Sequence, residues 1–134
     1  ASDVYKRQME PNNKRVLVVE DHPGLRDLTA IRLISAGYTV HGAANGFDAL
    51  EQMEKYSIDV VVTDHHMPKM NGFELLLACR KKWPGIPVVF LSGDHDNQAE
   101  EVVHRGAFAW VRKGSDFSIL LEVLATAAQQ SVHA

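Results

Sequence analysis

The sequence has little cysteine, no long apolar run and no marked excess of one charge. No apolar segment approaches the roughly 18 to 20 residues needed to cross a bilayer, and the N-terminus lacks the apolar core of a signal peptide. A formal net charge of -3, with both signs interspersed, provides neither a basic face for nucleic acid nor a polybasic segment for anionic lipid. We therefore expect a cytoplasmic protein that binds neither DNA nor membranes directly.

The single cysteine and the chain length indicate one ordinary domain. Cys79 falls in an apolar periodic segment, residues 73–83, which favours a small buried thiol over a reactive one. A chain of 134 residues can bury one core without disulfide or metal staples. The N-terminal segment is polar and aperiodic, and Met9 follows it as an initiator would. We expect a disordered or non-native extension over residues 1–13 and the domain over residues 14–130.

Short apolar runs predict five strands. Residues 15–19, 60–62 and 88–91 are too short for helices and too continuously apolar for half-exposed strands, so they indicate central parallel strands. Residues 38–43 and 109–111 alternate or are short, which suits flanking positions in the same sheet.

Helical patterns separate these strands. The last helix has apolar residues spaced by three, four and seven positions, which places one stripe on one face. The stripe consists of Phe117, Leu120, Leu121, Leu124 and Ala128. Four further helices are expected at residues 23–36, 46–55, 72–83 and 97–104. Alternating strands and helices with right-handed crossovers predict an α/β fold, a doubly wound parallel sheet covered on both faces.

Polar side chains follow four of the five strands. They are Glu20 and Asp21 after the first strand, Asp64 after the third, Ser92 after the fourth and Lys113 after the fifth. In such sheets, ligands bind beyond the carboxyl ends of the strands. We therefore expect three carboxylates, a hydroxyl and an ammonium to converge on one edge.

These groups suit phosphoryl transfer. Crowded carboxylates repel one another unless a cation neutralises them, and their hard oxygens suit Mg²⁺, which takes few protein ligands besides a substrate phosphate. One carboxylate can then act as a nucleophile and form an aspartyl phosphate, while Lys113 and Ser92 stabilise the phosphoryl oxygens. Each residue alone also fits a helix cap, a turn or a solvated surface, but their joint occurrence favours the chemistry.

Four segments match a known pattern in order and at close to its spacing. They are residues 16–21 (VLVVED), 61–72 (VVTDHHMPKMNG), 90–93 (FLSG) and 106–113 (GAFAWVRK). The second is the most specific, because it resembles a complete phosphoacceptor motif. Over residues 14–128 the sequence thus resembles the receiver domains of response regulators, of which the chemotaxis receiver protein is the simplest.

The resemblance implies a flavodoxin-like sheet of strand order 2-1-3-4-5 and a role in two-component phosphorelay signalling. Asp64 would accept a phosphoryl group from a sensor histidine kinase or a histidine phosphotransfer protein, and a downstream protein target would read the result. The domain would be no enzyme beyond its own phosphoryl transfer and dephosphorylation. The implied ligands of Mg²⁺ are Glu20, Asp21, Asp64 and the backbone carbonyl of His66.

The resemblance also implies a switch. Ser92 and Lys113 would contact the phosphoryl group, and Ser92 with Trp110 would change the surface of the fourth helix, fifth strand and fifth helix. Two residues depart from the family pattern. Trp110 stands where Tyr, Phe or His is usual, and its bulky indole is expected to rotate less freely. Gly114 stands where a proline usually follows the lysine, which removes the ring that would favour a cis bond.

Two more positions are implied to set the lifetime of the phosphoryl group. His66 lies two residues beyond the acceptor, and Asp94 lies two residues beyond Ser92. We expect His66→Asn to change the dephosphorylation rate. Whether the chain acts alone or is a fragment of a larger regulator or hybrid kinase stays open at the level of sequence.

Other functions compete with this interpretation. A zinc site could use His22, His65 and His66, but their spacing matches no fixed metal motif. A hydrolase with an aspartyl-phosphate intermediate would place a second Asp where His66 stands, and a nucleotide-binding loop of the Gly-x-x-x-x-Gly-Lys type is absent from the sequence. A receiver-like interaction module that no longer accepts phosphate is the main alternative, kept open by Trp110 and Gly114.

Overall fold

The computed structural model describes residues 13–93 and 98–133. Most of the expected extension at residues 1–13, and Asp94, lie outside the described residues. The strands are β1 (Arg15–Val19), β2 (Thr39–Ala43), β3 (Val60–Thr63), β4 (Val88–Ser92) and β5 (Ala109–Arg112). The helices are α2 (Pro23–Ser35), α3 (Gly46–Lys55), α4 (Gly72–Lys82), α5 (Ala99–His104) and α6 (Phe117–Gln130).

The five strands form one parallel sheet of order β2-β1-β3-β4-β5. The three strongest apolar runs are the central strands β1, β3 and β4, and the two weaker candidates are the edges, as predicted. Buried parallel strands must be apolar on both faces, which explains why β3 is buried at every residue. The predicted fold class and strand order are confirmed.

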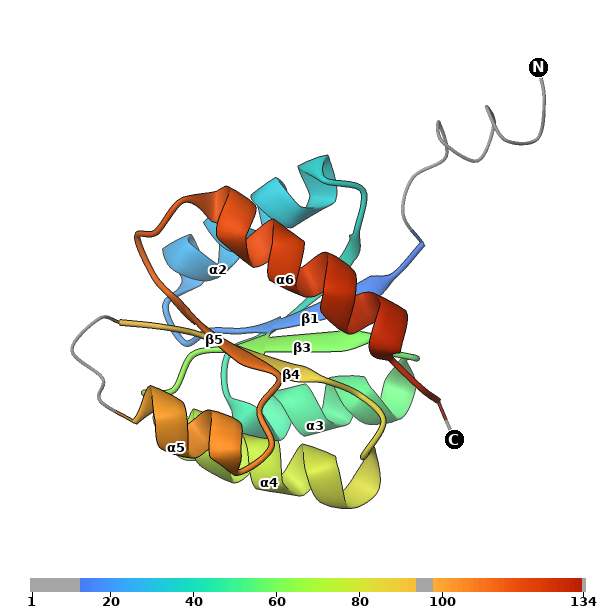
Figure 1. Ribbon diagram of the computed structural model, residues 1–134, viewed down its shortest axis with the longest axis vertical. Helices are drawn as coiled ribbons and strands as arrows, with labels where there is room; N and C mark the ends of the chain where they lie inside the picture. The colour runs from blue at the N-terminus through green and yellow to red at the C-terminus, as the bar shows by residue number, and fades with distance from the viewer. Residues whose placement is uncertain (1–12, 94–97, 134) are drawn as a thin grey trace.

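Helices cover both faces of the sheet. Helices α2 and α6 lie on one face, and α3, α4 and α5 lie on the other (Figure 1). Each layer has its own apolar core, and alternate residues of a strand belong to different cores, as Val16 and Leu17 of β1 do. Cys79 is completely buried in the α4 layer, and burial raises the pKa of its thiol to about 12, which confirms the predicted buried thiol.

Local signals determine where the helices begin and end. Helix α2 begins with Pro23, and the chain leaves it through Gly37, whose φ of 100° is the left-handed geometry that glycine accepts. Helix α4 opens with a capping box formed by Asn71 and Glu74. It ends at Lys82 rather than at the predicted position 83, because Trp83 precedes a proline and the helical conformation is disfavoured there.

In the described part of the chain, no helix has both the length and the apolar character that crossing a membrane requires.

Candidate functional site

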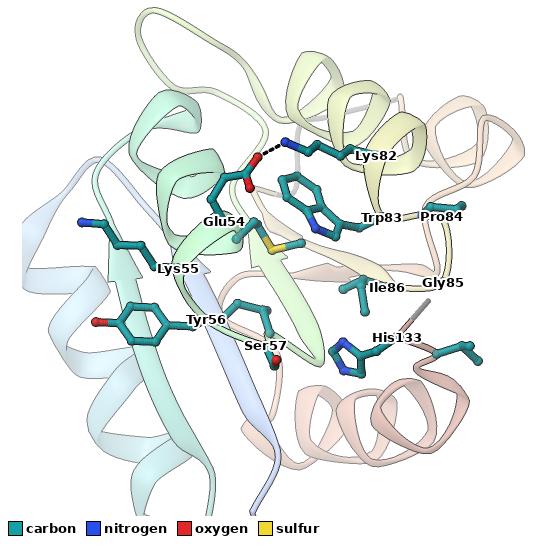
Figure 2. A pocket seen from close by; sticks show the side chains of 13 residues that line it. Glu54, Lys55, Tyr56, Ser57, Lys82, Trp83, Pro84, Gly85, Ile86 and His133 are labelled. Carbon is teal, nitrogen blue, oxygen red and sulfur yellow. Dashed lines mark hydrogen bonds and ion pairs between the residues drawn. The ribbon is translucent and has the colours of Figure 1, made fainter.

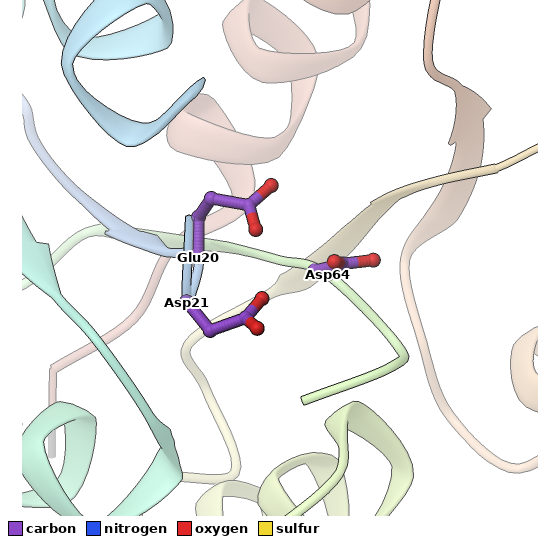
Figure 3. Close-up of side chains that lie close together, drawn as sticks. All are labelled: Glu20, Asp21 and Asp64. Carbon is purple, nitrogen blue, oxygen red and sulfur yellow. The ribbon is translucent and has the colours of Figure 1, made fainter. Parts of the chain in front are cut away.

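Three carboxylates meet at the carboxyl ends of β1 and β3 (Figure 3). Glu20 and Asp21 follow β1 directly, and Asp64 follows β3, so neighbouring strands bring together residues more than forty positions apart. Ligand oxygens of the three residues all lie within 4.8 Å of one another. The Glu20 side chain is 8 % exposed and that of Asp64 is 11 % exposed, whereas Asp21 is exposed.

Lys113 supplies the positive charge of this cluster. Its Nζ lies 2.6 Å from Oε1 of Glu20 and 3.2 Å from Oδ2 of Asp64. The residue stands directly after β5, and its backbone N–H donates to the Ser92 carbonyl at 2.7 Å, which extends the β4–β5 pairing to the site. Desolvation alone would lower the pKa of Lys113, but the hydrogen bond to Glu20 and the charges of Asp64 and Glu20 outweigh it and raise the pKa. The ammonium is therefore charged throughout the neutral range.

The other oxygen of Asp64 accepts hydrogen bonds from two neutral donors. Its Oδ1 accepts from Oγ of Ser92 at 3.1 Å and from the backbone N–H of His65 at 2.8 Å. Ser92 is completely buried at the end of β4. The Asp64 carboxylate is thus held by a cation on one oxygen and by neutral donors on the other.

Two supporting residues were not assigned roles from sequence. Arg26, one turn into α2, donates from Nη1 to the backbone carbonyl of Glu20 at 2.8 Å and fixes the chain at the acidic pair. Gly72 begins α4 against the acceptor loop, where an added Cβ would collide with the Asp64 carbonyl, the Phe90 ring and the backbone of His65. Glycine at the end of the acceptor motif was visible in the sequence, but this close approach was not.

Of the predicted switch and lifetime residues Trp110, His66 and Asp94, the first packs against the core and the second is exposed. Trp110 stacks on Phe90, with ring centroids 5.4 Å apart and planes 5° apart, so the indole already packs against the core below the site. The His66 side chain is exposed, and its ring centroid lies 4.8 Å from that of His65. Asp94 lies outside the described residues.

Gly114 adopts a conformation that a proline could not. Its φ is 86°, whereas the proline ring holds φ near -65°. The residue in the place of the family's usual proline therefore gives the loop after Lys113 a left-handed turn, with open space around the position where a Cβ would stand.

The donor set of the acidic cluster suits a hard divalent cation. The group that could hold a metal among the described residues consists of Glu20, Asp21 and Asp64 and contains no histidine. His22 uses its Nδ1 to accept the N–H of Leu25 and cap α2. The zinc interpretation, which required His22, therefore gains no support from this geometry, whereas carboxylate oxygens are the ligands that Mg²⁺ prefers.

A pocket lies at the end of the sheet opposite the acidic cluster (Figure 2). It is lined partly by Trp83, Ile86 and His133, and Lys82 and Glu54, which form an ion pair, also line it. Because Ile86 precedes β4, this pocket adjoins the amino ends of the strands. It is separate from the acidic site, which lies beyond the carboxyl ends.

Comparisons with known sequences find relatives that match most of the chain. The profile of the response regulator receiver domain matches residues 16–125. The chain is 33 % identical over 121 residues to the transcriptional regulatory protein GlrR of Escherichia coli, and 32 % identical over 127 residues to the CAI-1 autoinducer sensor kinase/phosphatase CqsS of Vibrio cholerae. These matches cover 89 % and 92 % of this chain but only 27 % and 18 % of the relatives. The chain therefore spans about a quarter of GlrR and less of CqsS.

Solved structures share the fold. A receiver domain protein of Clostridium thermocellum superposes with a TM-score of 0.83 at 28 % identity, covering 87 % of this chain and 95 % of that one. The response regulator TrrA of Thermotoga maritima, solved in complex with Mg(2+)-BeF, has a TM-score of 0.79 at 30 % identity, with 85 % and 98 % covered. The chemotaxis response regulator CheY4 of Vibrio cholerae gives 0.78 at 30 % identity, with 87 % and 99 % covered.

Proposed function

This chain belongs to the response regulator receiver domain family of two-component phosphorelay signalling, and we propose that within it Asp64 is the residue that accepts the phosphoryl group. The observation that carries the proposal is the environment of this carboxylate. Asp64 lies beside Glu20 and Asp21, and Lys113 neutralises its Oδ2 from 3.2 Å. These contacts hold the carboxylate in place beside a cation, and a carboxylate oxygen is the nucleophile that forms an acyl phosphate.

The transfer is a displacement at phosphorus. A carboxylate oxygen of Asp64 forms a bond to the phosphorus, and the bond from phosphorus to the donor imidazole nitrogen breaks, leaving its electron pair on the imidazole. The ammonium of Lys113 moves from Asp64 Oδ2 to a phosphoryl oxygen and balances the charge gained at the site. Ser92 Oγ, at 3.1 Å from the acceptor, is close enough to donate a hydrogen bond to another phosphoryl oxygen.

The acidic cluster would hold Mg²⁺ through Glu20, Asp21 and Asp64, with the backbone carbonyl of His66 as a further oxygen ligand. When bound, the ion offsets the negative charge of the incoming phosphoryl group. Three carboxylates lie around one ammonium, so negative charge is in excess at this site. This excess supports the binding of a divalent cation there. The Mg(2+)-BeF complex of the related TrrA supports the choice of magnesium.

The signal would reach the surface through Ser92 and Trp110. Ser92 moves toward the phosphoryl group, and the space that it leaves changes the packing of Trp110. We propose that His66 and Asp94 set the lifetime of the phosphoryl group by controlling the approach of water. Residues 14–130 form the functional domain in this proposal, and residues 1–13 lie outside it.

The donor would be a sensor histidine kinase or a histidine phosphotransfer protein in the cytoplasm, and a downstream protein would bind the phosphorylated form. The domain would catalyse only its own phosphorylation and dephosphorylation. Helix α2 starts beside the acidic pair and exposes apolar side chains. Leu25 and Leu28 line a groove that reaches Lys113, and Ile31 is exposed further along the same helix. We propose this surface as the contact for the donor protein, because a phosphohistidine must come within bonding distance of Asp64.

The test of the acceptor is phosphoryl incorporation from acetyl phosphate or phosphoramidate with Mg²⁺, followed by intact-protein mass spectrometry. We expect one labile phosphoryl group on the wild type, and none on Asp64→Asn or after chelation of the metal. Asp27→Asn is the matched control, because it makes the same change of charge at an exposed site on the neighbouring helix. Incorporation into Asp64→Asn at the wild-type level would refute the assignment.

A second arm tests the donor surface. Ile31→Lys should slow transfer from a phosphorylated partner protein but leave labelling by acetyl phosphate unchanged, because the small donor needs no docking surface. If no protein in the set incorporates phosphate while all remain folded, the phosphate-independent interaction module becomes the better description.

A further inference from the structure

His65, the residue directly after the proposed acceptor, is a buried imidazole in an apolar environment. Only 4 % of the residue is exposed. Its ring centroid lies 5.9 Å from those of both Phe90 and Trp110, the latter in an edge-on contact. A buried polar ring needs hydrogen-bond partners to offset its desolvation, and the partner of this ring is a side chain distant in sequence. Its Nε2 lies 2.8 Å from Oε1 of Gln98, thirty-three residues away.

The backbone of His65 is fixed at the same time. Its N–H donates to Oδ1 of Asp64 at 2.8 Å, and its carbonyl accepts the N–H of Gly72 at 2.8 Å. The acceptor carboxylate and the Gln98 side chain are therefore joined through one residue, by the peptide N–H at one end and by the imidazole at the other.

Gln98 is the residue from which α5 begins. Its side chain makes no capping hydrogen bond to the first turn of the helix, and it reaches back to His65 instead. Its backbone carbonyl accepts the N–H of Val102, the buried residue of α5. The His65 imidazole thus contacts the residue that starts α5.

The contact leaves one polar atom unsatisfied. Because the Gln98 oxygen can only accept, Nε2 of His65 donates this hydrogen bond, and in the neutral imidazole Nδ1 is then an acceptor. Within the described residues, this buried Nδ1 has no hydrogen-bond partner. A buried acceptor without a hydrogen bond raises the free energy of the conformation that contains it. The free-energy gap to another conformation, in which Nδ1 is hydrogen-bonded, is therefore smaller.

We propose that His65 is a positioning residue that couples the phosphorylation state of Asp64 to α5, in parallel with Ser92 and Trp110. The inference rests on the proposed function of Asp64. In the acyl phosphate, the anhydride linkage removes the charge from the carboxyl group, so the charge-assisted hydrogen bond from the His65 N–H weakens and the phosphoryl oxygens compete for that donor. The peptide shifts, the imidazole moves with it, and the contact with Gln98 loosens at the start of α5.

The test is hydrogen exchange of the α5 amides, measured with and without acetyl phosphate and Mg²⁺. The variants are His65→Leu, which removes the imidazole but keeps the peptide N–H, Gln98→Ala, their combination, and the conservative His65→Gln. His104→Gln is the matched control, because His104 is exposed on α5 away from His65. Mass spectrometry of the same samples reports the phosphoryl group on Asp64.

We expect phosphorylation to change α5 exchange in the wild type, in His104→Gln and in His65→Gln. His65→Leu and Gln98→Ala should reduce this response while still carrying phosphate. Without phosphate, each should accelerate α5 exchange, with no further acceleration in the double variant. A full response in His65→Leu would overturn the coupling and leave the acceptor assignment intact. A wild type that takes up no phosphate would refute the proposed function instead, and additive acceleration in the double variant would by itself refute the His65–Gln98 contact.

Discussion

Replacing Lys113 with methionine should destabilise the metal-free protein, because the carboxylates would then face one another without the ammonium that contacts both Glu20 and Asp64. The side chain of Lys113 is 29 % exposed, and its two carboxylate partners are 8 % and 11 % exposed. Methionine preserves most of the alkyl stem, so the substitution removes charge with little loss of packing.

The magnitude follows from the burial of the pairs. Removing one partner of a fully buried ion pair costs roughly 3 to 5 kcal/mol, while exposed pairs contribute about 0 to 1 kcal/mol. Lys113 lies between these limits, and partial exposure screens its charge, so we expect a loss of about 2 kcal/mol. With a urea m-value of roughly 1 to 3 kcal/mol/M, this loss lowers the unfolding midpoint by about 1 M.

The assay is urea unfolding followed by circular dichroism, in EDTA and in Mg²⁺. Magnesium should restore part of the stability of Lys113→Met, because a bound cation replaces the missing charge.

Asp21→Asn should behave in the opposite way. Asp21 is exposed, so removing its charge relieves repulsion at little cost, and the variant should gain up to about 1 kcal/mol in EDTA and respond less to Mg²⁺.

Two results would contradict this reasoning. If Lys113→Met were as stable as the wild type in EDTA, the ammonium would not be offsetting the charge of the acidic cluster. If Asp21→Asn were destabilised instead, the three carboxylates would not be repelling one another, and the physical basis for a metal site would fail.

Four further predictions concern other parts of the molecule. Burial and the nearby charge of Arg15 lower the pKa of His41, so as the pH falls below about 6.5 the unfolded chain takes up the proton first. The stability associated with His41 is therefore present above that pH and lost below it, and in urea titrations at several pH values His41→Gln should flatten the acid side of the curve. Cys79 should resist alkylation at pH 8 until the protein unfolds, and Cys79→Ser should cost roughly 1 to 3 kcal/mol in the same titrations, since a hydroxyl would be buried at an apolar site. Gly114→Ala should cost about 1 to 2 kcal/mol through its left-handed φ alone, without steric conflict, and labelling by acetyl phosphate should persist. Gly72→Ala should slow that labelling severalfold, because its Cβ would displace the acceptor loop, and a wild-type rate would show that the loop tolerates the shift.

The fold was predictable because its signals are local. The runs that became β1, β3 and β4 are continuously apolar, and strands of that kind must lie inside a parallel sheet with both faces covered. The convergence of Asp64 with Glu20 followed from topology, since neighbouring parallel strands end at the same edge. The end of α4 was predicted one residue late, because the restriction that Pro84 places on Trp83 was not considered.

The role of His65 was not predictable from the same information. A histidine beside an acceptor looks like a metal ligand or a solvated residue in sequence, and its burial depends on Phe90 and Trp110, which come from two other strands. Its partner Gln98 is separated from it by α4 and β4, and no periodic pattern links the two. The packing of Trp110 on Phe90 likewise depends on the pairing of β4 with β5 and not on either segment alone.

Under the proposed function, the two oxygens of Asp64 separate the chemistry of the site from its signal. Oδ2 faces Lys113, so this side carries the charge that transfer requires. Oδ1 faces Ser92 and the His65 N–H, which are neutral donors, and the His65 ring contacts Trp110 and Gln98 at the start of α5. Charge stabilisation and conformational coupling therefore use different atoms, and variants should separate them. Lys113→Met should slow labelling of Asp64 but preserve the α5 response of the labelled fraction, whereas His65→Leu should permit labelling and reduce the response.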